Sequence, residues 1–242
     1  MSTTPAPPAG RPGYRARSEW IQDHAADVRS LFLRCVDRPL PVFLPGMFIS
    51  IAIPLIDEVR VRPYTIASLT AGREPFEIVF NRVPGGAGTG WLFACKPGDE
   101  INFTGPFGAF TIDRAPTATT VFIAEGTGIA PIRPMLHKVL RAPAPQSVDL
   151  LYIADRDDHL LYREELAALA TEFPRMHLET KISTDGIWTA IIRDVIRRRW
   201  IEADSDRTRQ FYICGIGSGV IEARDLLRAA GYERHAVRYE KW

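Results

Sequence analysis

The feature that most constrains the fold is a change of pattern near Pro116. Before it, short apolar runs are separated by turn residues, a pattern that indicates a small antiparallel barrel or sandwich. After it, apolar runs of strand length alternate with helical patterns, which is typical of a doubly wound parallel sheet. The sequence therefore predicts a β domain followed by an α/β domain.

The boundaries follow from the same patterns. Residues 1–14 are rich in proline and glycine and are predicted to be a disordered leader. The β domain is predicted over 15–114 and the α/β domain over 115–242. In the β domain, strands are expected at Val28–Cys35, Met47–Ile53, Val59–Ala67, Phe76–Val83 and Ile101–Phe103, with a helix at Gly88–Ala94. In the α/β domain, strands are expected at Thr120–Ala124, Val148–Ala154, Met176–Ile182, Gln210–Cys214 and Ala236–Tyr239, and helices at Ile129–Leu140, Leu161–Thr171, Trp188–Arg199 and Val220–Ala230.

Composition narrows the class of protein. A chain of 242 residues, 46% hydrophobic and 24% charged, has the balance of a globular protein. Its net charge of +1 provides no field that would attract nucleic acid or an anionic membrane. Neither a membrane-spanning run nor a signal peptide is evident, so we expect a cytoplasmic protein. Three scattered cysteines form no disulfide framework and cannot supply the four thiolates of an iron–sulfur cluster, and no metal site is predicted.

Gly126-Thr127-Gly128 directly follows an apolar strand. An open α/β sheet binds ligands at the carboxyl end of its strands, where a helix N-terminus presents free amides to a pyrophosphate. The glycines permit close approach of the backbone to such a ligand. The alternative is an ordinary glycine-rich turn between a strand and a helix.

Two motifs in the β domain have a similar chemistry. Arg62-Pro63-Tyr64-Thr65 supplies a guanidinium group, an aromatic face and a hydroxyl within four residues, and Arg62 and Tyr64 share one face of a strand. Gly85-Gly86-Ala87-Gly88-Thr89 closes a strand and opens a short helix, which makes it a second candidate anion site. The alternatives are a solvated strand face for the first motif and a flexible hairpin loop for the second.

Two further features lie near the C-terminus. Cys214-Gly215 ends a buried strand, where a lone cysteine is more often part of the core than of the chemistry. Glu240-Lys241-Trp242 ends the last predicted strand with a carboxylate and an indole. Each motif alone is weak evidence, but their order along the chain indicates two nucleotide sites.

In this order and spacing, the motifs resemble those of the ferredoxin–NADP reductase family, over about residues 15–242. The resemblance implies a flavin-binding barrel and then a nicotinamide-binding α/β domain, with the two reactive rings meeting between them. It implies that Arg62 pairs with the flavin nucleotide's phosphate, that Tyr64 stacks on the isoalloxazine and that Thr65 bonds near its N5, with Pro63 completing the motif. It also implies that the flavin's pyrophosphate is held by Gly85, Gly86, Gly88 and Thr89, and that its adenosine side is lined by residues from Asn81 to Val83.

For the nicotinamide nucleotide, the resemblance implies contacts with Gly126, Thr127 and Gly128. It places Cys214, with Gly215, beside the reacting nicotinamide carbon. Glu240 matches a family carboxylate near the flavin edge, and Trp242 matches a terminal aromatic residue, often tyrosine, that covers the flavin face and must move aside for nicotinamide. The predicted catalytic residues are therefore Thr65, Cys214, Glu240 and Trp242.

Smaller features of the sequence bear on which nicotinamide nucleotide is the donor and which flavin is bound. Family members that prefer the 2′-phosphate tend to have Ser-Arg after the third strand of this domain, whereas this chain has Ser183-Thr184-Asp185. Asp155 could bond to a ribose hydroxyl and repel a phosphate, although Arg156 argues for the phosphate. NADH is therefore favoured over NADPH. FAD is favoured over FMN because the loop at 85–89 and the strand before it offer a place for adenosine diphosphate.

The function that these expectations imply is a flavoprotein reductase, which takes a hydride from NAD(P)H onto FAD and passes electrons to a separate ferredoxin or oxygenase component. Family members with a fused iron–sulfur domain have cysteines that this chain lacks. One alternative is a reductase of free flavin, and another is an electron-transfer or nucleotide-sensing subunit without independent turnover. The arginine cluster over 193–199 is either a docking face for an acidic ferredoxin or a solvated helix face balanced by Glu202, Asp204 and Asp206.

Overall fold

The computed structural model describes residues 13–69, 75–143, 146–183 and 188–242. The chain divides into two compact units, unit 1 over Met1–Thr111 and unit 2 over Ile112–Trp242. The sequence prediction placed this division three residues later. Most of the predicted leader lies outside the described residues, but Tyr14 already belongs to the first strand.

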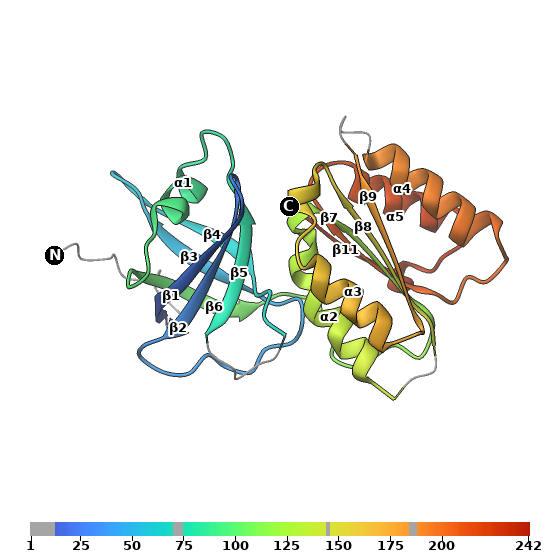
Figure 1. Ribbon diagram of the computed structural model, residues 1–242, viewed down its shortest axis with the longest axis horizontal. Helices are drawn as coiled ribbons and strands as arrows, with labels where there is room; N and C mark the ends of the chain where they lie inside the picture. The colour runs from blue at the N-terminus through green and yellow to red at the C-terminus, as the bar shows by residue number, and fades with distance from the viewer. Residues whose placement is uncertain (1–12, 70–74, 144–145, 184–187) are drawn as a thin grey trace. The chain divides into compact units, whose positions relative to one another are not determined.

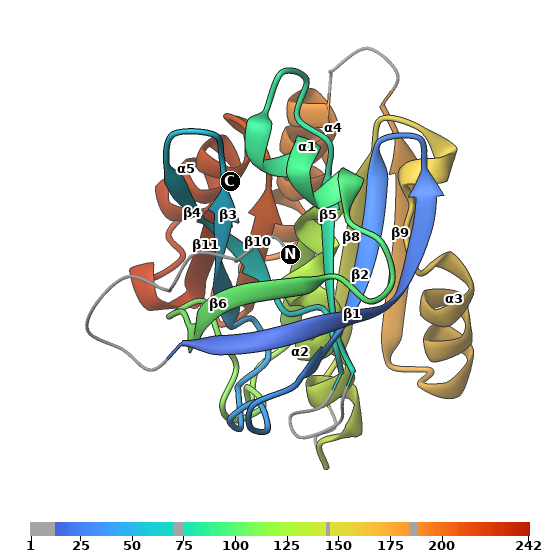
Figure 2. The same ribbon diagram turned by 90° about the vertical axis from the view of Figure 1, so that its left-hand side faces the viewer.

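Unit 1 is an antiparallel sheet with one helix. Its strands are β1 Tyr14–Ala25, β2 Val28–Cys35, β3 Phe48–Pro54, β4 Val59–Thr65, β5 Phe76–Asn81 and β6 Glu100–Phe107, and its helix is α1 Ala87–Ala94. The strand order is β4-β3-β6-β1-β2-β5. Ile66, just after β4, forms an antiparallel bridge with Ile78 of β5, so the two edge strands approach each other and the sheet curls into a barrel (Figure 2).

The interior of this barrel is built from aliphatic and aromatic side chains of all six strands, with Leu92 of α1 packed among them. Strand β1 was absent from the sequence prediction, because its apolar signal is weak. The residues that it buries most deeply are Ala16 and Ser18, which are small, and charged side chains alternate with them. Strand β6 is longer than the predicted Ile101–Phe103 because it continues through Gly105 to pair with β3.

Unit 2 is a five-stranded parallel sheet between two layers of helices. Its strands are β7 Thr120–Glu125, β8 Val148–Ala154, β9 Met176–Ile182, β10 Gln210–Gly215 and β11 Val237–Lys241, and its longer helices are α2 Ile129–Arg141, α3 Arg163–Glu172, α4 Trp188–Ile196 and α5 Gly219–Ala229. The strand order is β11-β10-β7-β8-β9, with every neighbouring pair parallel. Helices α2 and α3 cover one face and α4 and α5 the other (Figure 1). The predicted fold class is confirmed.

The main departure in unit 2 is at the arginine-rich helix. The predicted Trp188–Arg199 helix is α-helical only to Ile196, and Arg197–Glu202 continue it as a π-helical turn. All four arginines of the cluster have acidic partners: Arg193 with Glu222, Arg197 with Glu202, Arg198 with Asp194, and Arg199 with Asp149 and Glu179. This pairing favours a balanced helix face over a docking face, although Asp204 and Asp206 pair with Arg209 instead.

The described helices include none with the length and apolar character needed to cross a bilayer.

Candidate functional site

The residues predicted for the nicotinamide nucleotide gather at one edge of the unit 2 sheet. Because all five strands are parallel, their carboxyl ends lie together, and the chain runs from β7 to β8 in one direction along the sheet but from β10 to β11 in the other. Ligands of open α/β sheets bind at such a reversal point. Gly126–Gly128 follow β7, Asp155 and Arg156 follow β8, Ser183 follows β9, Cys214 and Gly215 end β10, and Trp242 follows β11.

The glycine turn after β7 packs directly on the end of β10. Gly126–Gly128 form one 3-10 turn before α2 begins at Ile129, and Gly126 has a φ of +52°. A Cβ on Gly128 would lie 2.3 Å from the carbonyl oxygen of Cys214. Only glycine permits this approach, so the turn and the Cys214–Gly215 peptide form one continuous backbone surface.

Glu125, which the sequence analysis did not select, ties the same two elements together. Its Oε2 accepts a hydrogen bond from the N–H of Ile216 at 2.6 Å, across the end of β10. Burial raises the pKa of this carboxyl, and the hydrogen bond from Ile216 opposes the shift. Its signal in the sequence is an acidic residue that ends an otherwise apolar strand.

Cys214, Glu240 and Trp242 lie on the other side of this centre. Burial strongly raises the pKa of the Cys214 thiol, and the charges of Glu240 and Glu125 add to the effect, so the thiol is protonated at neutral pH. Burial also raises the pKa of Glu240, against a hydrogen bond from the Trp242 indole N–H at 2.7 Å. The backbone N–H of Trp242 donates to the Gly215 carbonyl, and its indole is 40% exposed.

On the β8 side, the predicted pair Asp155 and Arg156 is held by a residue not selected from the sequence, His159. Its Nδ1 lies 2.5 Å from Asp155 Oδ1 and its Nε2 lies 2.5 Å from an Arg156 nitrogen. The neighbouring Ser183 is buried at 5% exposure, and within the described part of the chain its hydroxyl has no hydrogen-bond partner. A free buried hydroxyl at this edge fits a polar ligand. Thr184 and Asp185, which entered the donor prediction, lie outside the described residues.

In unit 1, the structure brings the two predicted flavin motifs together. A Cβ on Gly88 of α1 would lie 3.8 Å from Arg62 Cγ and 4.0 Å from the Tyr64 hydroxyl. The Arg62 guanidinium donates only to the carbonyl of Val61, so among the described residues it has no carboxylate partner. The Tyr64 ring packs edge-on against Phe80, and burial raises its pKa to about 12. Thr65, next on the strand, is buried.

The loop before α1 is organised by its own residues. Gly85 has a φ of +69°, and a Cβ on Gly86, the N-cap, would lie 2.8 Å from Val83 Cβ. The Thr89 hydroxyl accepts a hydrogen bond from the Val83 N–H at 3.0 Å, so it is used in shaping the loop. The first amides of α1 lack partners within the helix. We call these amides, together with the Arg62 side chain that approaches Gly88, the unit 1 cradle, a candidate site for an anionic group.

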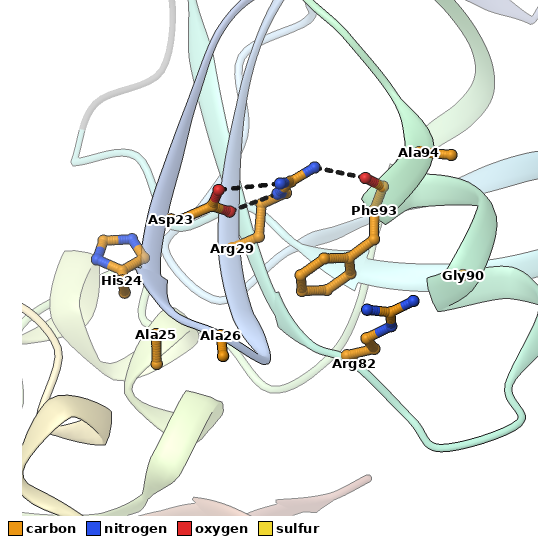
Figure 3. A pocket seen from close by; sticks show the side chains of 9 residues that line it. All are labelled: Asp23, His24, Ala25, Ala26, Arg29, Arg82, Gly90, Phe93 and Ala94. Atoms are coloured by element: carbon orange, nitrogen blue, oxygen red, sulfur yellow. Dashed lines mark hydrogen bonds and ion pairs between the residues drawn. The ribbon is translucent and has the colours of Figure 1, made fainter.

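The opposite face of α1 lines a separate pocket of about 470 Å³ (Figure 3). Gly90 and Phe93 lie there, about 200° and about 140° around the helix from Gly88. In this pocket Arg29 donates to the Phe93 carbonyl at 2.6 Å and pairs with Asp23, as the dashed lines in Figure 3 show. A cation on a carbonyl of the last turn stabilises a helix C-terminus. Arg29 therefore anchors the last turn of α1 to strand β2 on the face of the helix away from Gly88.

The predicted site residues thus form two groups, one in each unit. Asn81 ends β5, and Val83 follows it within the loop that leads to α1. Pro63 lies in β4 between Arg62 and Tyr64. The described residues contain no cluster of three or more His, Cys, Asp or Glu that could hold a metal ion.

Comparison with known proteins agrees with this division. Residues 25–112 match the oxidoreductase FAD-binding domain family, and residues 122–224 match the oxidoreductase NAD-binding domain family. Ferredoxin–NADP reductase B of Sorangium cellulosum is 31% identical over 95% of this chain and 97% of its own length. The reductase component of Rhodococcus jostii propane 2-monooxygenase is 29% identical over 94% of this chain, which spans 63% of that protein.

Solved structures share the fold. The Amycolatopsis cytochrome P450 reductase aligns with a TM-score of 0.79 at 24% identity, over 95% of this chain and 69% of its own. The FAD/NAD-binding domain of Vibrio cholerae nitric oxide dioxygenase aligns with a TM-score of 0.78 at 22% identity, over 96% of this chain and 99% of its own. At these identities the likeness concerns the fold alone. From the two matched domains and the near full-length similarity to a ferredoxin–NADP reductase, this chain belongs to the ferredoxin–NADP reductase family.

Proposed function

We propose that this protein takes a hydride from NADH onto bound FAD and delivers electrons to a separate ferredoxin or oxygenase component. The observation that supports the proposal is that each unit contains one candidate nucleotide site. In unit 1 the Arg62 side chain approaches Gly88 near the α1 N-terminus, and its guanidinium has no carboxylate partner among the described residues. In unit 2 the glycine turn packs on the end of β10 at the reversal point of the sheet.

The roles of the residues follow from their chemistry. Bound flavin supplies the ability to accept a hydride and release electrons one at a time. Arg62 and the α1 amides hold the flavin's phosphates, while Tyr64 offers its ring to the isoalloxazine. The glycine turn at 126–128 holds the nucleotide pyrophosphate, Ser183 bonds to its adenosine side, and the protonated Cys214 adds no charge beside the nicotinamide. Little acid–base chemistry is required, so positioning accounts for most of the rate.

NADH is the proposed donor because of the charges after β8. The Asp155 side chain is 60% exposed and can accept hydrogen bonds from a ribose diol. Arg156, the residue that argued for NADPH, has its guanidinium against Asp158 at 3.0 Å. The proposal of a separate acceptor is supported by the names of the relatives, which are ferredoxin reductases and reductase components of oxygenases.

The test is an absorbance spectrum of the purified protein before and after stoichiometric NADH, and then NADPH. Bleaching of a yellow flavin band by NADH, followed by ferricyanide reduction, is the expected result. Protein that loses its flavin on gel filtration would favour the free-flavin reductase. Flavin-loaded protein that oxidises no NADH with ferricyanide would favour the subunit without turnover.

A matched pair of variants tests the unit 1 cradle. Arg62→Ala removes the unpaired guanidinium and is expected to lower FAD retention by about tenfold or more, the size of one charge-assisted hydrogen bond. Arg60→Ala removes an arginine two residues earlier on β4 that is already paired with Glu58. Equal FAD retention in the two variants would contradict the assignment of Arg62.

A further inference from the structure

We propose that His159 is a positioning residue for donor selection: it holds Asp155 in place for a ribose diol and keeps Arg156 from reaching a 2′-phosphate. This inference rests on the proposed function, because it concerns the adenosine end of the same nucleotide site. It begins from the buried side chain of His159, which lies between an acid and a base at the carboxyl end of β8.

The two contacts determine how each ring nitrogen is used. A guanidinium group only donates hydrogen bonds, so the Nε2 atom facing Arg156 accepts one. The Nδ1 atom, on the other side of the ring, faces Asp155 Oδ1 and donates to it. His159 therefore bridges the base and the acid, and both neighbours are restrained by one ring.

The restraint on Arg156 is reinforced from a second direction. Its Nε lies 3.0 Å from Asp158 Oδ1, while its Nη2 faces the His159 ring. Arginine is the residue that accommodates a 2′-phosphate in dinucleotide-binding domains, because its fork binds two phosphate oxygens at once. Because Nε and Nη2 are already engaged, Arg156 cannot offer two arms of its fork to a phosphate without giving up an existing contact.

The backbone of His159 is itself anchored to the glycine turn. The hydroxyl of Tyr152, on strand β8, lies 3.1 Å from the Gly126 carbonyl and 3.0 Å from the His159 carbonyl. It also accepts a hydrogen bond from the Leu161 N–H at 3.0 Å. Tyr152 is 1% exposed, so this junction is enclosed. The distance between the predicted pyrophosphate turn and the Asp155–His159 pair is thus set by buried hydrogen bonds.

The test compares kcat and KM for NADH and NADPH in the FAD-loaded enzyme. His159→Leu removes both ring contacts and places an apolar side chain of similar size in the buried position. It is expected to lower the NADH-to-NADPH ratio of kcat/KM by about tenfold, through KM rather than kcat. His159→Gln, which retains one donor and one acceptor, is expected to restore most of the ratio. Adding Arg156→Ala to His159→Leu should remove the gain with NADPH.

A binding measurement separates this inference from the proposed function. Titration with 5′-AMP and with 2′,5′-ADP by calorimetry reports on the adenosine site whether or not the flavin is reduced. His159→Leu is expected to shift relative affinity toward 2′,5′-ADP by the same factor. If the wild type prefers NADPH, the proposed donor is wrong, but this shift is still expected.

An unchanged ratio of the two affinities in a folded His159→Leu variant would overturn the inference. If that variant does not fold, Asp158→Asn releases Arg156 without altering the buried ring. It is expected to shift the affinities in the same direction by a smaller factor, and no shift would again overturn the inference.

Discussion

The contact between Gly128 and Cys214 gives the sharpest test of how the unit 2 edge is built. Gly128→Ala would place its Cβ 2.3 Å from the Cys214 carbonyl oxygen, 2.6 Å from its carbonyl carbon and 2.9 Å from the Gly215 nitrogen. All three are backbone atoms at the carboxyl end of β10, so no side chain can rotate away. Overpacking of a core lowers the free energy of unfolding by about 1–3 kcal/mol. We expect a loss of about 3 kcal/mol here, because all three contacts are with backbone atoms.

That cost converts to a measurable shift. For a unit the size of unit 2, the entropy of unfolding is about 0.3 kcal/mol/K, so Gly128→Ala should lower its Tm by about 10 °C. Gly126→Ala is the matched control, because the same methyl group there meets no atom within 4 Å. Its cost of about 1–2 kcal/mol comes only from the positive φ of Gly126. The assay is thermal unfolding followed by circular dichroism, at equal FAD content and without added nicotinamide nucleotide.

A Gly128→Ala variant that melts within about 2 °C of the wild type, or above Gly126→Ala, would refute this reasoning. It would mean that the turn can move away from β10 at little cost. The glycines at 126–128 would then be needed for the ligand alone and not for the sheet.

Two further predictions concern unit 2. Burial alone would raise the pKa of Glu165, but hydrogen bonds from His137 and Arg133 outweigh it and lower the pKa to about 2. The ionised Glu165 should therefore contribute about 2 kcal/mol, after solvent screening, to the free energy of unfolding. This contribution should be complete above about pH 5 and be lost as the pH falls toward 2. Urea unfolding of Glu165→Gln should show no such loss, whereas the exposed Glu164→Gln should behave as the wild type does. Trp242→Ser should increase the affinity for NAD⁺, because the resemblance assigns this indole to the place that nicotinamide must enter; a spectroscopic titration with unchanged affinity would contradict that assignment.

Much of the fold was predictable because its elements have strong periodic signals. Strands β8 and β9 agree with the sequence prediction at both ends, since each is a run of strand length between clear breaks. Strand β1 was missed because a barrel strand can bury small side chains such as Ala16 and Ser18, which carry little hydrophobic signal. The early end of α4 was also missed, since a π-helical turn keeps the composition of a helix.

The candidate site was predictable only where a motif is local. The glycines at 85–88 and 126–128 and the Arg62 motif lie in short segments, so their chemistry can be inferred from neighbouring residues in the sequence. Glu125, Tyr152 and His159 acquire their importance from partners on other strands and turns, such as the Ile216 amide for Glu125 and the Gly126 carbonyl for Tyr152. No pattern of spacing in a single sequence reports such partners.

The two sides of the unit 2 edge differ in charge, and this difference is a consequence of burial. Toward β10 and β11, burial raises the pKa values of Glu125, Cys214 and Glu240, which disfavours negative charge there. Toward β8, the Asp155 side chain is largely exposed and its carboxyl contacts the His159 ring. An oxidised nicotinamide ring is cationic, so an ionised carboxylate beside it would stabilise the bound product and slow its release. A ribose diol, by contrast, is recognised by a charged acceptor. We therefore expect the nicotinamide end of the nucleotide to lie where burial disfavours an ionised carboxyl, and the ribose diol to lie at the exposed Asp155.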